Sequence, residues 1–350
     1  MKEAYASFLL GGHMNIYDEN GYVDIEVILS INIPFIFIIG GRSTGKTYGA
    51  LWHAIKECIK FILMRRTQTQ TDIINNPDFS PFKPINRDKG TNITTCKIEK
   101  NIGGIYDDIE SGGAPIGYTT ALSTIKNVRG FDASDVDLII YDEFIPEKHE
   151  RGIKAEADAL WNAIETMNRN RELIGLPPIQ LLALANSNDL ANPLFLDLGV
   201  IRVIKKMQKK GQNAYINRER GLAIFDLGDS EISVKKAETA LYKLKKGSDF
   251  AKMSLSNQYA NEIAGRIKSR SLKEFLPIVM IGELCIYEHK HDDILYATTH
   301  KLGNPDTYTL GDVDKARFIR TYMWVWEYFI NNKIEFEEHL CEILLKKVFM

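Results

Sequence analysis

Several features that mark other protein classes are scarce in this 350-residue chain. It has four cysteines, Cys58, Cys96, Cys285 and Cys341, which lie far apart and form no C-x-x-C pair. This spacing indicates neither a zinc site nor a disulfide framework, so we expect reduced, buried thiols of a cytosolic protein. No apolar run approaches the roughly eighteen residues that span a bilayer, and the N-terminus lacks a signal-peptide pattern. Membrane and disulfide-rich secreted classes are therefore disfavoured.

A strong overall charge is also missing, because the formal net charge is only −2. The average hides an asymmetry: residues 201–273 hold 17 Lys+Arg and 7 Asp+Glu, whereas the rest holds 27 and 39. The basic residues form four clusters, at 205–210, 235–236, 243–246 and 266–270. Such clustering is typical of contact with a phosphate backbone, and equally of a solvated face. Charge alone leaves both interpretations open.

The length predicts two or three domains. Residues 1–200 alternate apolar and helical segments, with strands expected at 33–39, 61–64, 138–141 and 179–185 and helices at 48–61 and 154–171. This alternation predicts an α/β fold with a parallel sheet.

The basic charge shift suggests a second domain, a mostly helical linker over 201–272 with helices at 234–244 and 255–267. Residues 273–350 predict a small α+β C-terminal domain, with strands at 277–287 and 294–299 followed by helical segments.

A glycine-rich loop follows the first expected strand. Its sequence fits the P-loop pattern G-x-x-x-x-G-K-T and comprises Gly40, Gly41, Arg42, Ser43, Thr44, Gly45, Lys46 and Thr47. In this pattern backbone N–H groups surround the phosphates of a nucleotide, the lysine reaches the β/γ-phosphates, and the hydroxyl of Thr47 holds Mg²⁺. Strand, turn and helix N-terminus together make an anion site. The loop predicts binding of ATP and Mg²⁺.

Two adjacent carboxylates end a second apolar strand, in the segment Asp135-Val-Asp-Leu-Ile-Ile-Tyr-Asp142-Glu143. Asp142 is predicted to join the Mg²⁺ shell, and Glu143 to polarise a water for in-line attack on the γ-phosphate. Small-molecule kinases need no such glutamate, so the pair indicates hydrolysis. An acidic turn after a core strand is the alternative, which the upstream P-loop disfavours.

Three further polar residues are candidates for the site. The expected helix 154–171 has an apolar face, and at 100° per residue Arg169 projects opposite this face whereas Arg171 returns toward it. This geometry favours Arg169 as an arginine finger toward a neighbouring subunit's ATP, with Arg171 bracing the helix end or snorkelling over the core. Asn186 ends a buried strand and is predicted to be a sensor of the γ-phosphate or the attacking water. Ordinary surface arginines and a turn-capping asparagine are the alternatives.

These motifs together resemble the DNA-packaging ATPases of small tailed phages of the phi29-like type, relatives of the terminase large subunits. The resemblance runs in the same order through nearly the whole chain. It is carried by GGRSTGKT (40–47), STIKNVRG (123–130), LIIYDEFIPEK (138–148), ETMNRNRE (165–172), LALANSNDLANPLF (182–195) and GSDFAKMSLSNQYANEIAGRIKSRS (247–271).

The resemblance implies an additional-strand, catalytic-glutamate P-loop ATPase domain, a small helical linker and a degenerate RNase H-like C-terminal domain that binds nucleic acid. It implies a homopentameric ring that acts in the host cytoplasm at the prohead portal, with a prohead RNA in phi29-like phages, and that translocates double-stranded DNA. Lys46, Thr47, Asp142 and Glu143 match the Walker residues, and Arg169 the trans-acting finger. Arg129 matches a basic trans-acting position that is lysine in relatives. Residues 1–30 are longer than the family pattern, so the adenine contacts stay undefined.

Three other functions were weighed. A terminase with a working nuclease would need converging carboxylates, for which there are six candidates, Glu283, Glu288, Asp292, Asp293, Asp312 and Asp314. A protein-remodelling ATPase would not need the basic segment. A nucleotide-binding protein without turnover is disfavoured by Glu143.

Overall fold

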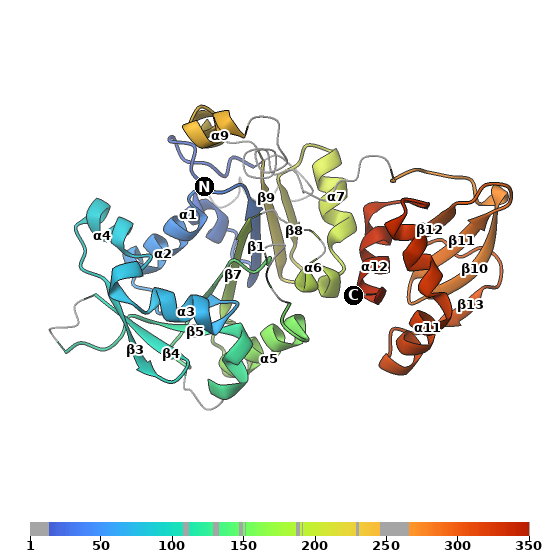
Figure 1. Ribbon diagram of the computed structural model, residues 1–350. Coiled ribbons are helices and arrows are strands. Elements are labelled where there is room, and N and C mark those ends of the chain that lie inside the picture. The colour runs from blue at the N-terminus through green and yellow to red at the C-terminus, as the bar shows by residue number, and fades with distance from the viewer. Residues whose placement is uncertain are drawn as a thin grey trace. The chain divides into compact units, whose positions relative to one another are not determined.

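The computed structural model describes residues 14–107, 112–128, 133–146, 150, 152–186, 190, 192–228, 231–245 and 266–349. The chain divides into two compact units, Met1–Ala260 and Asn261–Met350 (Figure 1). Each unit is built around its own sheet. None of the helices among these residues combines the length and the apolar character that crossing a bilayer requires.

A nine-stranded sheet forms the centre of the first unit, in the order β3-β4-β5-β2-β6-β7-β1-β9-β8. The strands are β1 (Phe35–Gly40), β2 (Phe61–Arg65), β3 (Thr94–Glu99), β4 (Ile102–Tyr106), β5 (Gly117–Ala121), β6 (Leu138–Asp142), β7 (Gln180–Asn186), β8 (Ala214–Asn217) and β9 (Leu222–Leu227). The six strands from β5 to β9 in this order are parallel, and antiparallel strands close both edges. The parallel sheet predicted for this part of the chain is confirmed.

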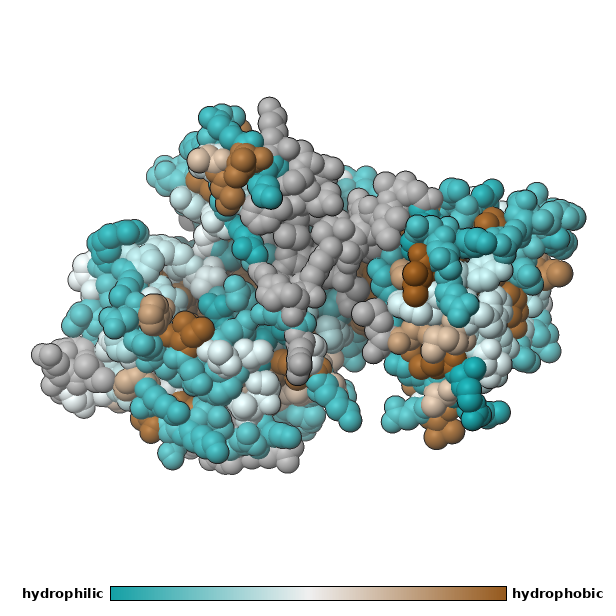
Figure 2. All heavy atoms as spheres, viewed as in Figure 1, coloured by the Kyte–Doolittle hydropathy of each residue, from teal (hydrophilic) through white to brown (hydrophobic). Residues whose placement is uncertain are grey.

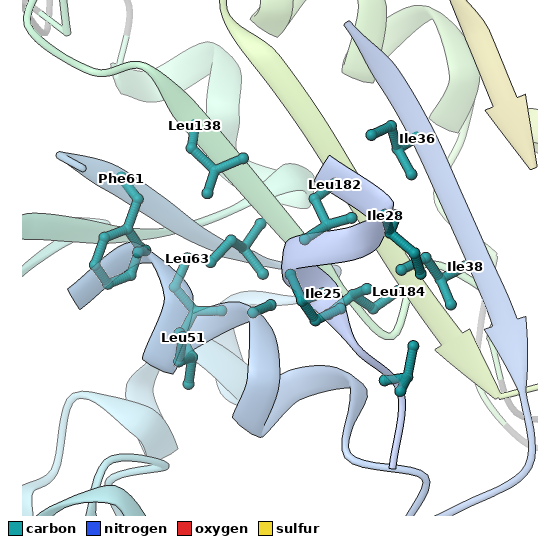
Figure 3. Close-up of a cluster of buried hydrophobic side chains, with 14 of the residues drawn as sticks. Ile25, Ile28, Ile36, Ile38, Leu51, Phe61, Leu63, Leu138, Leu182 and Leu184 are labelled. Carbon is teal, nitrogen blue, oxygen red and sulfur yellow. The ribbon is translucent and has the colours of Figure 1, made fainter. Parts of the chain in front are cut away.

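Helices cover both faces of this sheet. They are α1 (Ile25–Leu29), α2 (Lys46–Lys56), α3 (Gln68–Ile74), α4 (Lys83–Lys89), α5 (Glu156–Asn168), α6 (Pro193–Leu198), α7 (Ile201–Lys209), α8 (Glu231–Ala237) and α9 (Ala240–Leu244), with short 3₁₀ turns at Pro77–Phe79, Leu122–Val128 and Glu172–Ile174. Figure 3 shows Ile25 and Ile28 of α1 beside Ile38, Leu182 and Leu184, and Leu51 of α2 beside Leu63, all in one core cluster.

The opposite face of the sheet carries an aromatic cluster. Phe37 lies on the other side of β1 from Ile36 and Ile38, and its ring contacts Phe144 and Phe195 at centroid distances of 5.5 and 5.7 Å. Because successive strand residues point to opposite faces, a strand covered on both sides must be apolar throughout, and residues 36–39 are fully buried. The continuous apolar run is thus explained by helices on both faces.

The order of the strands places three functional segments side by side. β7 lies between β1, which leads into the P-loop, and β6, which ends at Asp142. The registers align Gly40 with Asn186, and Asp142 with Leu184. This intervening strand is the arrangement expected of the additional-strand class, and it brings all three strand ends to one edge of the sheet.

Two expected helices are shorter than their apolar pattern. α2 ends at Lys56 rather than Phe61, because Cys58 adopts a left-handed φ of 53° and turns the chain into β2. α5 ends at Asn168 rather than Arg171, because Arg169 has a φ of 45°. The helical projection from which the orientations of Arg169 and Arg171 were predicted is therefore wrong, since neither residue is within the helix.

The predicted domain boundary after residue 200 differs from the observed boundary between the two units, which lies after Ala260. β8 and β9 belong to the large sheet, where β9 pairs with β1, so residues 201–227 extend the first unit and are not mostly helical. The basic residues misled the prediction, because α7 buries Ile201, Ile204 and Met207 and directs its lysines outward. The expected helix 234–244 is two short helices, and most of 255–267 lies outside the described residues.

The second unit contains a five-stranded mixed sheet in the order β13-β10-β11-β12-β14. Its elements are a 3₁₀ turn at Leu272–Glu274, β10 (Phe275–Ile281), β11 (Leu284–His289), β12 (Leu295–Thr298), β13 (Asp306–Tyr308), α11 (Asp312–Ile330), β14 (Ile334–Phe336) and α12 (His339–Phe349). The expected strand 277–287 is a hairpin, because Gly282 turns the chain with a φ of 56°. Strand 294–299 and the helical C-terminus match the prediction.

The cysteines follow the prediction only in part. None of the four cysteines forms a disulfide: Cys285 and Cys341 are buried, Cys96 is half-buried, and Cys58 is exposed at the turn after α2. The apolar spacing that placed Cys58 inside a helix does not hold beyond Lys56.

Candidate nucleotide-binding site

The P-loop connects β1 to α2 in a turn that only small residues and left-handed backbone permit. Gly45 has a φ of 87° and Ser43 a φ of 65°. A Cβ at Gly40 would lie 2.5 Å from the Cβ of Leu227, so β9 packs directly against the base of the loop. The Val23 N–H donates to the Thr44 carbonyl at 2.9 Å. Residues before α1 therefore buttress the loop, which the sequence did not predict.

Lys46 is the most enclosed cation of this site, with 7% of its surface exposed. Its Nζ donates to the carbonyls of Gly41 at 2.7 Å and Gly40 at 3.2 Å, and to Thr44 Oγ1 at 3.2 Å. Burial lowers the pKa of Lys46 to about 8, although the charge of Asp142 acts in the opposite direction. Lys46 Nζ also lies 3.4 Å from Asn186 Oδ1, as expected for a residue that senses the same phosphate.

Thr47 and Asp142 form a paired set of hard oxygen donors. The Thr47 hydroxyl lies 3.0 and 3.1 Å from the two carboxylate oxygens of Asp142, which is itself buried. Mg²⁺ takes such oxygens, completing its shell with phosphate oxygens and water, so these two residues fit it. No group of three or more His, Cys, Asp or Glu side chains suited to a metal occurs among the described residues, and a P-loop Mg²⁺ site does not need one.

Glu143 follows Asp142 on a strained backbone, with a φ of 61°. A bulky residue in this region costs on the order of 1 kcal/mol or more and is held there by its surroundings. Half of its side chain is exposed, and its Oε2 lies 2.7 Å from Arg65 NH1. The charge of Glu143 acts to raise the pKa of Lys46, so the carboxylate lies near the P-loop lysine.

Arg65, at the end of β2, is a residue of this site that the sequence analysis missed. Its guanidinium contacts both Walker B carboxylates, with NH2 2.9 Å from Asp142 Oδ2 and NH1 2.7 Å from Glu143 Oε2. Only 13% of the Arg65 side chain is exposed. β2 pairs with β6 in parallel, so the end of one strand meets the end of the other. The basic pair Arg65-Arg66 directly after an apolar strand was the available signal.

The next residue, Arg66, points away from the site and is fully buried. Its guanidinium makes a bidentate pair with Glu156, at 2.8 and 2.9 Å, and contacts Glu150 at 3.0 Å. The Tyr141 hydroxyl donates to Glu156 at 3.1 Å, and burial raises the pKa of this tyrosine well above its ordinary value. This network fastens the start of α5 to the strands that carry Arg65 and Asp142.

Arg169 and Arg171 lie near the amino ends of the parallel strands, whereas Lys46 lies at their carboxyl ends. Arg171 is buried, donates to the carbonyls of Ser134, Val136 and Pro177, and pairs with Asp137. It braces the turn after α5, as predicted. Arg169 is exposed. Asp137 and Asp142 are five positions apart along the chain, about 16 Å of extended strand, so Arg169 does not meet its own chain's nucleotide site. Arg129 lies outside the described residues.

The carboxylates considered for a nuclease have separate partners. Asp293 pairs with Lys333 and Tyr328, whereas Asp314 accepts from Thr309 and faces Arg317. Asp292 contacts His289. These three acidic residues do not share a site.

The fold and the site define an additional-strand P-loop nucleotide-binding protein with a glutamate after the Walker B aspartate. The profile of a protein family described as Podovirus DNA encapsidation protein (Gp16) matches residues 17–310. The chain belongs to this family of DNA-packaging proteins, as its motifs predicted.

Individual relatives agree with this assignment. The chain is 26% identical to the DNA packaging protein of Bacillus phage phi29 over 303 residues, 84% of this chain and 83% of that protein. It is 29% identical to that of Bacillus phage B103 over 293 residues, 81% and 83% of the two chains. Its fold is similar to that of a solved structure of the bacteriophage Phi-29 viral genome packaging motor assembly, with a TM-score of 0.65, 21% identity and coverage of 94% and 98%.

Proposed function

We propose that this protein is the ATPase subunit of a viral motor that drives double-stranded DNA into a prohead. One observation carries the proposal: Lys46, Thr47, Asp142 and Glu143 converge at the carboxyl edge of a single sheet, with Asn186 between the two Walker strands. The family and the packaging proteins it resembles supply the DNA substrate. The alternatives of a protein-remodelling ATPase and a nucleotide binder without turnover have no comparable support.

The roles follow from the contacts. Lys46 binds the β/γ-phosphates, Thr47 and Asp142 hold Mg²⁺, which neutralises phosphate charge when bound, and Asn186 senses the terminal phosphate. Glu143 accepts a proton as the water oxygen attacks the γ-phosphorus and the bond to the ADP oxygen breaks. Arg65 positions Glu143 through its 2.7 Å contact.

Arg169 completes the site in trans. Because it is exposed and lies at the edge opposite Lys46, it can serve a neighbouring subunit and not its own. The turn that follows it exposes Leu173 and Ile174, at 84% and 71%, which gives a neighbour an apolar surface beside the arginine. We infer a ring, a homopentamer by family resemblance, that assembles in the host cytoplasm on the portal of the prohead, with prohead RNA as a further partner. Arg129 is a second candidate for action in trans.

Contact with DNA is proposed to be independent of sequence and made through basic surfaces. The outward side of α7 carries Lys206 and Lys209, both exposed. A motor that passes a whole genome must hold the backbone rather than bases. The proposal also includes a nucleic-acid-binding C-terminal domain of RNase H-like fold at 273–350. Of the linker predicted over 201–272, it keeps the part that follows the large sheet.

ATPase activity with and without DNA, and with and without proheads, tests this function. We expect stimulation by both, because the motor is complete only when subunits, portal and DNA are assembled. An ATPase activity that neither DNA nor proheads change, or that unfolded proteins stimulate instead, would refute the proposed motor function. DNA affinity should fall steeply with salt and barely vary with sequence.

A further inference from the structure

The chain returns to the P-loop after the large sheet is complete. β9 runs parallel to β1 and ends with Leu227 opposite Gly40, so the chain leaves the sheet beside the loop. α8 begins at Glu231, four residues later, and α9 follows directly. The segment 231–245, whose basic residues left contact with DNA and a solvated face both open, is therefore positioned at the nucleotide site.

Lys236 of α8 is in direct contact with the P-loop. Its Nζ donates to Ser43 Oγ at 2.9 Å and to the Arg42 carbonyl at 3.3 Å. The same ammonium group lies 5.3 Å from the ring centroid of Tyr242, a buried residue of α9. On the outer side of α9, Leu241 and Leu244 are exposed, and Figure 2 shows apolar side chains gathered there. Lys236 and Tyr242 are thus the inward side chains of this segment.

Two lysines consequently approach one loop from different elements. Lys46 comes from α2 and contacts the carbonyls of Gly40 and Gly41, and Lys236 comes from α8 and contacts the next two residues. Their charges oppose each other: that of Lys236 adds to the burial that lowers the pKa of Lys46. Two ammonium groups that converge on one loop suit a polyanion.

We propose that Lys236 is a second phosphate-binding lysine, which binds the terminal phosphate of the nucleoside triphosphate and thereby ties segment 231–245 to the P-loop. The inference rests on the proposed function, because it assumes that ATP binds at Lys46. Lys46 reaches the β/γ-phosphates, so a cation beside it at residues 42 and 43 meets the outer end of the triphosphate. Loss of the γ-phosphate removes the anion that Lys236 contacts.

A bracing role is the competing explanation, in which Lys236 only supports the loop through Ser43. The two roles differ in their dependence on the nucleotide. A brace supports binding of di- and triphosphates alike, whereas a ligand of the terminal phosphate favours the triphosphate. The ratio of the two affinities therefore separates them.

The experiment measures Kd for Mg-AMP-PNP and Mg-ADP by isothermal titration calorimetry in the full-length protein. Lys236→Ala should weaken AMP-PNP binding on the order of tenfold, the scale of one charge-assisted hydrogen bond, and ADP binding less than about twofold. Lys236→Met, which keeps the stem over Tyr242 without the charge, should behave the same way. Lys235→Ala, on the same helix but exposed, is the matched control and should leave both constants unchanged.

An equal loss of affinity for AMP-PNP and ADP would show that Lys236 only braces the loop, and would overturn the proposal. Wild-type affinities in both Lys236 variants would overturn it as well. Failure of the proposed function looks different. If the wild type does not bind AMP-PNP, or if Lys46→Ala binds it normally, the site itself is misassigned whatever Lys236 does. Melting temperatures without nucleotide show whether each variant is folded.

Discussion

Glu143 combines a strained backbone with a half-exposed carboxylate, and both features suit a group that must meet a water. Glu143→Gln keeps the shape and removes the proton acceptor. We expect hydrolysis to fall on the order of 10²- to 10⁴-fold while ATP binding is retained. Turnover and Kd measured on the same preparation check this, and a variant with normal turnover would remove Glu143 from the mechanism.

Lys46 makes nucleotide binding depend on pH. Because burial lowers its pKa to about 8, the free protein begins to lose this charge above pH 8, whereas bound phosphate favours the charged form. Binding must then take up a proton, so the affinity for Mg-ADP should fall about tenfold per pH unit above pH 8 and stay level below it. Calorimetry in buffers of different ionisation enthalpy measures the proton uptake; a level affinity up to pH 10 would contradict the lowered pKa.

At the scale of elements, the end of β2 connects the nucleotide site to helix α5 through two neighbouring arginines. Arg65 contacts the carboxylates of the site, and Arg66 makes the buried bidentate pair with Glu156 at the start of α5. Adjacent strand residues point in opposite directions, so one strand end serves both. α5 is thus fixed at its first turn to the strand that holds the Walker B residues in place.

Breaking the buried pair should destabilise the fold strongly. Arg66→Met leaves Glu156 buried without its bidentate partner, a change that costs about 3–5 kcal/mol in comparable pairs. Urea unfolding measures the loss. Arg87→Met, which removes an exposed pair with Asp88, is the control and should change the free energy of unfolding by less than about 1 kcal/mol. A similar effect in both variants would show that burial of Arg66 does not matter.

The sequence predicted the elements whose signal is local. The strands with continuous apolar runs, β1, β2, β6 and β7, were found because a strand covered on both faces cannot contain polar residues. β3 to β5, β8 and β9 were missed. β3 and β8 are edge strands that contain polar residues, β4 and β5 contain glycine or threonine, and β9, although buried throughout, lies in the segment that was assigned to a helical linker from its basic charge. The ends of α2 and α5 depend on left-handed residues, Cys58 and Arg169, that no propensity rule anticipates.

For the site, the motif residues were predictable and their partners were not. Lys46, Thr47, Asp142 and Asn186 meet because their strands end at one edge, which the motifs imply. Arg65 and Lys236 reach the same edge from β2 and α8, and only the order of strands in the sheet reveals this. Contacts between segments that are far apart in the sequence produce no recognisable spacing of residues.

At the scale of the whole molecule, Arg169 and Glu143 belong to different half-sites under the proposed mechanism. Arg169→Ala subunits lack the finger and Glu143→Gln subunits lack the base, so each inactive variant retains what the other has lost. Mixing them should restore part of the ATPase activity, measured against either variant alone. Arg220→Ala, which changes an exposed arginine in the turn before β9, should be active unmixed; an absence of rescue in assembled mixtures would contradict action in trans.

The placement of Lys46 and Arg169 at opposite edges of one sheet also gives the subunit a direction. A two-fold dimer pairs identical surfaces and ends with two subunits, whereas a head-to-tail contact between the two ends can be repeated from subunit to subunit until it closes. An open row of subunits always leaves one half-site at each end without its complement. Under the proposed mechanism, closure into a ring removes these ends, so the last subunit to join completes two sites at once and leaves no half-site without its complement.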